Sequence, residues 1–172
     1  KLRRRIKKLV QDGYAVSFLD ESIYSLIPYI TKGWFAVGSK PTKKIINSPH
    51  QKLCVFGALF QDEVVTKISK KINSTKFLEF VKRLYKNNGK LCIIADNASW
   101  HLTKKVMNFI KTNKIKLIRL LAYSPELNPI EQYWQNIKKW LGTRIWFSIQ
   151  ELEKELRSAL RRKILVPNRY EY

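Results

Sequence analysis

Short apolar runs alternate with turn-forming residues along the chain, and most of these runs have the length of a β-strand. They occupy residues 14–20, 52–60, 64–69, 91–96 and 115–121, with a further short run at 33–38 between two glycines. Apolar runs of this length, bounded by turn signals, are typical of buried strands. The acidic turn at residues 61–63 predicts a hairpin between the two runs that flank it.

Apolar residues recur with a helical period in four other segments. They predict helices at 75–87, at 102–112, from residue 130 onward, and at about 148–163. The first of these helices has Ser74 or Thr75 as its candidate N-cap. Gly89 is its expected C-terminal stop.

The predicted order places strands with antiparallel hairpin chemistry first and strand–helix units afterwards. Strand–helix units favour parallel additions to a sheet. We therefore predict an α/β fold with a mixed five-stranded sheet, in which three antiparallel strands are followed by parallel strands, and with helices on both faces. This is the layout of ribonuclease H-like folds, matched here by pattern alone.

The chain has 172 residues, which is the size of one domain. We assign residues 13–172 to this domain. Residues 1–12 are basic and are interpreted as a linker or helix that leads in from a missing N-terminal region. No apolar run approaches the roughly 20 residues of a membrane span, and no secretory signal follows the basic N terminus.

Charge is the strongest signal in the composition. Lysine and arginine number 34 against 13 aspartates and glutamates, which gives a net charge of +21. Such a surplus disfavours the compact state by self-repulsion, and a polyanionic partner such as DNA or RNA is its commonest reason. A generally basic surface, as in some thermophiles, and a membrane-surface protein are the alternatives.

Three carboxylates stand where the predicted elements begin or end. Asp20 and Asp96 each follow an apolar strand, and Glu131 opens a helix directly after Pro129 and Ile130. Ligands bind at the carboxyl ends of strands in open α/β sheets, and the positive end of a helix dipole favours a carboxylate. Taken singly, each aspartate could be a turn former or helix cap, and Glu131 could serve only the helix dipole.

Three carboxylates that converge on one rim repel one another unless a cation joins them. Carboxylate oxygens with waters left over suit Mg²⁺ or Mn²⁺. Two such ions, about 3.5–4 Å apart, can clamp the attacking and leaving oxygens of a phosphodiester. The carboxylates and the basic surface together therefore indicate phosphoryl transfer on nucleic acid.

Three sequence blocks carry a family resemblance. The strings FLDES (18–22), ADNASWH (95–101) and SPELNPIEQYW (124–134) closely resemble the catalytic blocks of mariner-like insertion-sequence transposases, which belong to the DDE group with a ribonuclease H-like fold. The 34 residues from 97 through 130 that separate the second aspartate from the glutamate match the spacing of this family. The resemblance covers about residues 12–145.

The resemblance implies a catalytic, metal-binding triad and a set of supporting residues. The triad is Asp20, Asp96 and Glu131, and the supporting residues are Asn97, His101 and Asn128. The implied activity is cleavage of DNA at transposon ends and strand transfer into a target, commonly TA, with two Mg²⁺ or Mn²⁺ ions. A homodimer that holds two ends, and action on the chromosome in a prokaryotic cytoplasm, are also implied.

Two of the supporting residues have simpler interpretations. His101 could position a phosphate, a water molecule or Glu131, or could merely bond to backbone at the start of a helix. Asn97 could order a metal-bound water, although capping of the following helix is the favoured role. Glu21 is next to Asp20, and because successive side chains of a strand point to opposite faces, we expect both not to bind one metal.

Gln135, Lys138 and Trp100 are candidate DNA contacts. Gln135 and Lys138 fall one and two turns after Glu131 on the same helix, but a solvated basic face is the commoner role of a single lysine. Trp100 could stack on an unpaired base, although packing is its more frequent role. The other tryptophans include Trp134, which we assign to the core.

Two other functions remain in competition with a transposase. One is a ribonuclease H or resolvase-like nuclease, which gives no reason for the third block. The other is a domesticated, non-catalytic DNA-binding domain, against which the intact triad argues. Members of the resembled family also carry an N-terminal helix-turn-helix region, and none is predicted in this sequence.

Overall fold

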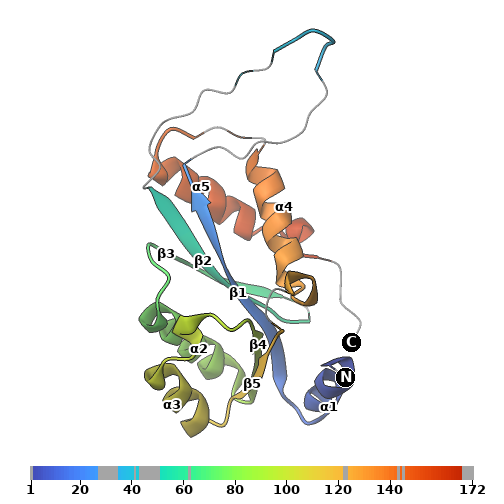
Figure 1. Ribbon diagram of the computed structural model, residues 1–172, viewed down its shortest axis with the longest axis vertical. Helices are drawn as coiled ribbons and strands as arrows, with labels where there is room; N and C mark the ends of the chain where they lie inside the picture. Colours follow the sequence, from blue (N-terminus) through green and yellow to red (C-terminus); the bar gives the residue numbers. More distant parts are fainter. Residues whose placement is uncertain are drawn as a thin grey trace.

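The computed structural model describes residues 2–26, 35–40, 42, 51–61, 63–121, 124–142, 144 and 146–167. The strands are β1 (Ala15–Ser25), β2 (Lys52–Leu59), β3 (Val64–Ser69), β4 (Leu91–Ala95) and β5 (Lys116–Arg119). They form one sheet in the order β3-β2-β1-β4-β5 (Figure 1). β1, β2 and β3 pair antiparallel, whereas β1, β4 and β5 pair parallel. The predicted mixed five-stranded sheet is confirmed.

Helices cover both faces of this sheet, as predicted (Figure 1). The α-helices are α1 (Leu2–Gln11), α2 (Ser74–Asn88), α3 (Lys104–Thr112), α4 (Ile130–Gly142) and α5 (Ile149–Leu160). Short 3-10 turns are η1 (Ser99–His101), η2 (Pro125–Leu127) and η3 (Lys163–Leu165). One hydrophobic core joins α1, α4 and α5 to one face, and a second joins α2 and α3 to the other. Within the described residues, no helix has the length and apolar character needed to cross a membrane.

The alternation of side chains along β1 divides its residues between the two cores. Val16 and Phe18 belong to the core under α4 and α5, whereas Leu19 belongs to the core under α2 and α3. The same alternation sends Asp20 and Glu21 toward opposite faces. A single strand therefore supplies charged groups to two separate environments.

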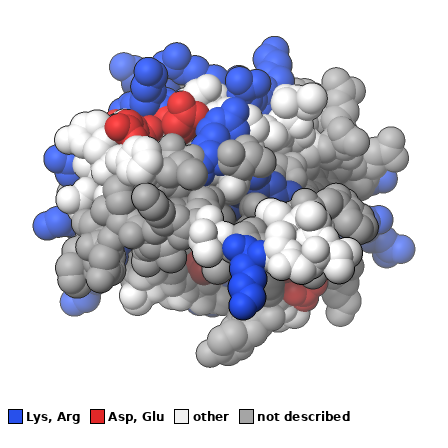
Figure 2. All heavy atoms as spheres, turned by 90° about the horizontal axis from the view of Figure 1, so that it is seen from above, with Lys and Arg blue, Asp and Glu red and all other residues white. Residues whose placement is uncertain are grey.

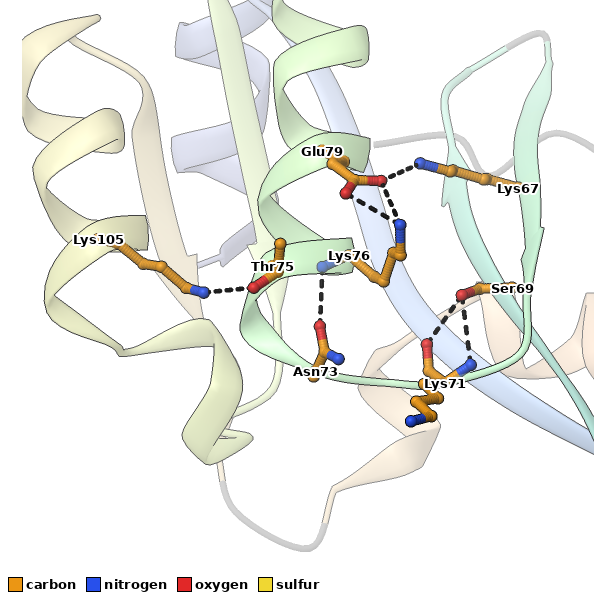
Figure 3. Close-up of polar contacts among 8 residues, drawn as sticks. All are labelled: Lys67, Ser69, Lys71, Asn73, Thr75, Lys76, Glu79 and Lys105. Carbon is orange, nitrogen blue, oxygen red and sulfur yellow. Dashed lines mark hydrogen bonds and ion pairs between the residues drawn. The ribbon is translucent and has the colours of Figure 1, made fainter.

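The start of α2 differs slightly from the prediction. Asn73, with an extended backbone, is the N-cap, and its side chain accepts a hydrogen bond from the Lys76 amide at 2.9 Å (Figure 3). Ser74 and Thr75 thus lie inside the helix. Gly89 ends it as expected, at a φ of 63° that favours glycine.

Polar contacts tie α2 to its neighbours on both sides (Figure 3). Lys105 of α3 donates to the Thr75 hydroxyl at 2.5 Å. Glu79 accepts from Lys67 of β3 at 2.9 Å and from Lys76 at 3.0 Å. The pair between Glu79 and Lys67 joins α2 to the edge strand of the sheet.

The predicted strand at 33–38 is wrong for the part that the structure describes, and residues 33 and 34 lie outside the described residues. Residues 35–38 form loop and turn, and Phe35 is 60% exposed. Gly38 has a φ of 82°, and the amide of Ser39 donates to the Ala36 carbonyl across the turn. An apolar run between two glycines resembles a strand in sequence, but without a pairing partner it does not form one.

Candidate active site

Asp20 lies in the middle of β1 rather than at its end, which corrects the sequence prediction. The strand continues to Ser25 because β2 pairs with it along this whole length. The parallel pairing with β4, however, reaches only Phe18, opposite Ile94. Asp20 therefore still stands just beyond the carboxyl end of the parallel half of the sheet, where ligands bind in α/β folds.

A glycine on β2 makes room beside Asp20. Gly57 is the Cα partner of Asp20, and a Cβ built there would lie 2.5 Å and 2.6 Å from ring atoms of Trp134. The indole of Trp134 thus lies against bare backbone. From this position its Nε1–H donates to Asp20 Oδ2 at 2.9 Å. Trp134 is part of the core, as predicted, and it also holds the first aspartate.

Glu131 reaches the same place from α4. Its amide donates to the Asn128 carbonyl at 3.0 Å. The Asn128 side chain is buried, and its Nδ2 donates to the carbonyl of Leu19 at 3.4 Å. Asn128 thereby ties the start of α4 to β1 beside Asp20, and this contact gives a physical reason for the asparagine of the third block.

The environment of Asp20 raises the pKa of its carboxyl to about 7. Burial is the main cause, followed by the negative charges of Glu131 and then of Glu21, and only hydrogen bonds from Glu21 backbone and Trp134 oppose them. Trp134, one turn after Glu131 on α4, contacts Asp20 directly, which brings the start of α4 close enough for the charge of Glu131 to act on Asp20. Their pairing leaves negative charge that no described cation neutralises.

Asp96 follows β4 and is half exposed, with a side-chain exposure of 55%. If the pairing of β1 with β4 is continued by two residues, Asp96 stands beside Asp20. Its Oδ1 accepts from the Ala98 amide at 3.0 Å and lies 3.1 Å from His101 Nδ1. The hydrogen bond from His101 is the main reason that the pKa of Asp96 lies below its ordinary value.

His101 bridges two carboxylates in the core under α2. Its Nε2 lies 2.9 Å from Glu21 Oε1, and the two side chains are only 2% and 4% exposed. Each ring nitrogen thus faces a carboxylate oxygen, which accepts a hydrogen bond when the carboxyl is ionised. Burial by itself lowers the pKa of His101, but hydrogen bonds to Asp96 and Glu21, and their charges, raise it to about 9. Glu131, one of the partners considered for His101, is not among its contacts with the described residues. Its Nδ1 also lies 3.4 Å from the Asp96 carbonyl oxygen, in line with the simpler interpretation, and a role toward a phosphate or a water stays a prediction.

The donor set at the rim fits a divalent cation only in part. Carboxylate oxygens suit Mg²⁺ or Mn²⁺, and the raised pKa of Asp20 beside Glu131 marks a place where a cation would relieve repulsion. The buried Asn128 Oδ1 has no hydrogen-bond partner among the described residues. In the same described part of the chain, however, no three His, Cys, Asp or Glu side chains gather closely enough to hold an ion.

The remaining predicted residues take different places. The Asn97 amide donates to the Leu120 carbonyl at 2.9 Å, while Ala98 and Thr103 occupy the N-caps of η1 and α3, so the expected capping role is wrong. Trp100 is half-buried with its ring edge against His101. Gln135 is exposed on α4 and Lys138 is half-buried. Their contacts with DNA stay predictions.

Three features of the site were absent from the sequence prediction. They are Gly57, the hydrogen bond from Trp134, and the buried contact between Glu21 and His101. A glycine within an apolar strand does signal a close approach by another group, but it does not tell which group. The contact between Glu21 and His101 could not be predicted, because it depends on η1 folding back over the second face of β1.

Positive charge dominates the surface of the chain. Figure 2 shows one face on which lysine and arginine side chains outnumber the acidic ones among the residues drawn in colour. Some of the described acidic residues are engaged in ion pairs, as Glu79 is with Lys67 and Glu155 with Arg144. The surface field therefore favours a polyanion.

The chain belongs to the family of DDE superfamily endonucleases, whose model matches residues 15–153. It is 42% identical over 55 residues to the uncharacterized protein y4pE/y4sA of Sinorhizobium fredii, a stretch that covers 31% of this chain and 38% of that protein.

Solved structures of the Mos1 mariner transposase have a similar fold. The Mos1 strand transfer complex has a TM-score of 0.73 at 19% identity, covering 94% of this chain and 51% of that chain. The isolated Mos1 catalytic domain has a TM-score of 0.68 at 16% identity, covering 94% and 76%. The chain thus spans about half the length of the longer Mos1 chain. These likenesses establish the ribonuclease H-like fold.

Proposed function

We propose that this chain is the catalytic domain of a transposase, which cleaves DNA at the ends of a mobile element and transfers the strand into a target. The observation that supports the proposal is the hydrogen bond from Trp134 of α4 to Asp20 of β1, because Trp134 lies one turn after Glu131. A net charge of +21 suits the DNA substrate. Family membership supports the same chemistry.

In this proposal Asp20, Asp96 and Glu131 hold two Mg²⁺ or Mn²⁺ ions. When bound, the ions supply activation of a water or 3′-hydroxyl and stabilisation of the leaving oxygen. The chain's own residues hold the ligands: Trp134 fixes one oxygen of Asp20, and His101 fixes one oxygen of Asp96. In this proposal the other oxygen of each aspartate binds the metal. Mos1 structures described with Mn and with Mg give the proposal its choice of ions.

The partners in this proposal are two transposon ends and a target that contains TA. A homodimer would hold both ends, and Mos1 paired-end complexes have the same fold as this chain. Residues 13–172 form the catalytic domain, and residues 1–12 a basic lead-in, of which Leu2–Gln11 are helical. Recognition of the end sequences would rest with a separate DNA-binding region.

The test is Mg²⁺-dependent nicking of supercoiled plasmid by wild type and by Asp96→Asn. Loss of one metal ligand should lower the nicking rate on the order of a thousandfold, because metal stabilisation is worth several kcal/mol. Asp12→Asn, an exposed aspartate at the end of α1, is the matched control and should nick normally. Equal nicking by Asp96→Asn and wild type would refute the assignment.

A second arm separates the transposase from a ribonuclease H-like nuclease. The same proteins are incubated with an RNA–DNA hybrid and with DNA that carries a free 3′-hydroxyl end and a TA-containing target. Joined DNA products support the transposase. Cleavage confined to the RNA strand would overturn it.

A further inference from the structure

We propose that a basic groove along the edge strand β3 and helix α5 binds the phosphodiester backbone of duplex DNA, away from the carboxylate rim. Two adjoining hollows form this β3–α5 groove. One, of about 260 Å³, is lined by Thr66, Lys67, Ile68, Arg83, Arg157, Leu160 and Arg161. The other, of about 420 Å³, is lined by Lys154, Arg157, Ser158, Arg161 and Arg162. Because they share Arg157 and Arg161, they form one continuous surface.

Cations dominate the walls of the groove. Among the described residues, six lysines and arginines line it, and no aspartate or glutamate does. Lys67 and Arg157 are paired with Glu79 and Glu153, which lie outside the walls. Among the residues that the structure describes, Arg83, Lys154 and Arg161 form no ion pair. Unpaired cations held this close together repel one another until an anion joins them.

The dipole of α5 explains only part of this cluster. Cations are favoured in the last turn of a helix, which accounts for Arg157 and Arg161. It does not account for Arg83, which comes from α2 on the opposite face of the sheet, or for Lys67 on β3. Three separate elements therefore deliver positive charge to one hollow around the sheet edge.

The composition of the walls identifies the ligand. Arginine forks bind phosphate oxygens in bidentate fashion, and the hydroxyls of Thr66 and Ser158 add neutral donors. Of the described residues in the walls, Ile68 and Leu160 alone are apolar, and none is aromatic. Single-stranded nucleic acid is held by stacking on aromatic rings. The groove instead suits the backbone of a duplex, bound without regard to sequence.

The groove is separate from the proposed active site. β2 lies between β3 and β1 in the sheet, so β3 is roughly 10 Å from the strand that carries Asp20. Since α5 lies on the same face as α4, a duplex in the groove would be held beside the rim. This inference rests on the proposed function, because it assigns a second contact for the same substrate.

The test compares DNA binding by two matched double variants, measured by fluorescence anisotropy with a labelled duplex in EDTA. Arg83→Gln with Arg161→Gln removes two groove charges, both from exposed side chains. Lys111→Gln with Lys116→Gln removes two exposed charges from α3 and from β5, the opposite edge of the sheet. The groove pair should weaken binding about tenfold and lower the log–log salt slope by about 0.9 per lost phosphate contact. The control pair should change binding less than about twofold, because salt screens charges far from the bound duplex.

Equal losses in the two pairs would overturn the groove, because net charge alone would then explain binding. A second comparison uses unlabelled competitors at equal concentrations of negative charge. If inorganic phosphate or polyglutamate displaces the labelled duplex as well as unlabelled duplex does, the assignment to the DNA backbone is overturned. Thermal melts confirm that each variant is folded. Because the binding assay contains no divalent metal, it does not depend on catalysis. A wild type that shows the contrast between the pairs in EDTA but does not nick DNA with Mg²⁺ would refute the transposase and leave the groove intact. If the wild type nicks DNA but the two double variants weaken binding equally, the groove would be refuted and the transposase would stand.

Discussion

The two aspartates of the rim are held in opposite electrostatic ways. Asp20 is buried beside Glu131 with an indole as its only side-chain donor, and its pKa rises to about 7. Asp96 is half exposed and paired with the protonated His101, and its pKa falls below the ordinary value. The protonated His101 favours the ionised form of Asp96. Among the described residues, no cation does the same for Asp20.

This difference shows that the two halves of the site do different work before any metal arrives. The Asp96 half is already satisfied, because His101 and Glu21 form a buried chain of charges that ends at Asp96. The Asp20 half is destabilised by burial and repulsion. Without metal, the contacts of Asp96 should therefore stabilise the fold, whereas the burial of Asp20 beside Glu131 should destabilise it.

The largest effect should come from His101→Ala. Removing one member of a buried ion pair leaves the other charge uncompensated, which costs about 3–5 kcal/mol. Here the substitution would leave the Glu21 side chain, which is 4% exposed, buried without its charged partner. Urea unfolding in EDTA measures the free energy of unfolding, with exposed Lys111→Ala as control. A loss below about 1 kcal/mol, the scale of a surface pair, would mean that the chain of charges contributes little.

Asp20→Asn should have the opposite sign in the absence of metal. Removing the charge relieves its burial and its repulsion by Glu131, and a pKa raised from 3.8 to about 7 corresponds to a gain of up to about 4 kcal/mol at pH 8. Mg²⁺ should raise the Tm of wild type and not of the variant. A variant less stable than wild type in EDTA would contradict the unsatisfied state of Asp20.

The pH dependence of the metal-free protein follows from the same groups. Asp20, with its raised pKa, makes stability fall as pH rises from about 4 to about 7, because the native state keeps a proton that the unfolded chain has lost. His101, raised from 6.5 to about 9, contributes stability that is full below pH 6.5 and lost as pH rises through 9. Asp20→Asn should flatten only the lower window, as followed by chemical unfolding at each pH.

Gly57→Ala should be next in size. The added Cβ would collide with the Trp134 ring, and overpacking of a core costs about 1–3 kcal/mol. The indole must move, so its hydrogen bond to Asp20 should weaken as well. Thermal unfolding measures the loss. The same substitution in a Trp134→Leu background should cost much less, and an equal cost in both backgrounds would show that the indole is not the obstacle.

Trp134→Phe should give the smallest effect. It keeps most of the packing and removes only the hydrogen bond to Asp20 Oδ2, worth about 1 kcal/mol. Because this bond lowers the pKa of Asp20, its loss should raise that pKa further. An NMR titration of the Asp20 carboxyl carbon measures the shift. An unchanged pKa would place the control of Asp20 entirely in burial and charge.

Much of the fold could be predicted because its elements are locally consistent. The apolar residues of α4 recur in the sequence at helical spacing, and Ile130, Tyr133 and Ile137 are buried as expected. The hairpin of β2 and β3 follows from its turn. The apolar run at 33–38 was misinterpreted because strand formation depends on a partner strand, which no local pattern reveals.

The candidate site divides in the same way. Asp20, Asp96 and Glu131 are predicted from their blocks and stay a prediction, whereas the opposed directions of Asp20 and Glu21 follow from strand alternation. The end of β1 was placed too early because β2 extends it beyond the parallel pairing. The contact between His101 and Glu21 joins residues 80 positions apart in the chain. Only the folded sheet brings them together.

The double pairing of β1 has a consequence for synthesis on the ribosome. This strand cannot be completed on its parallel side until β4 emerges, and Glu131 arrives later still, when α4 docks. Every partner of Asp20 on α4 is thus more than a hundred positions behind it. Under the proposed function, a nascent chain that stops short of α4 would lack Glu131 and would be unable to cut DNA.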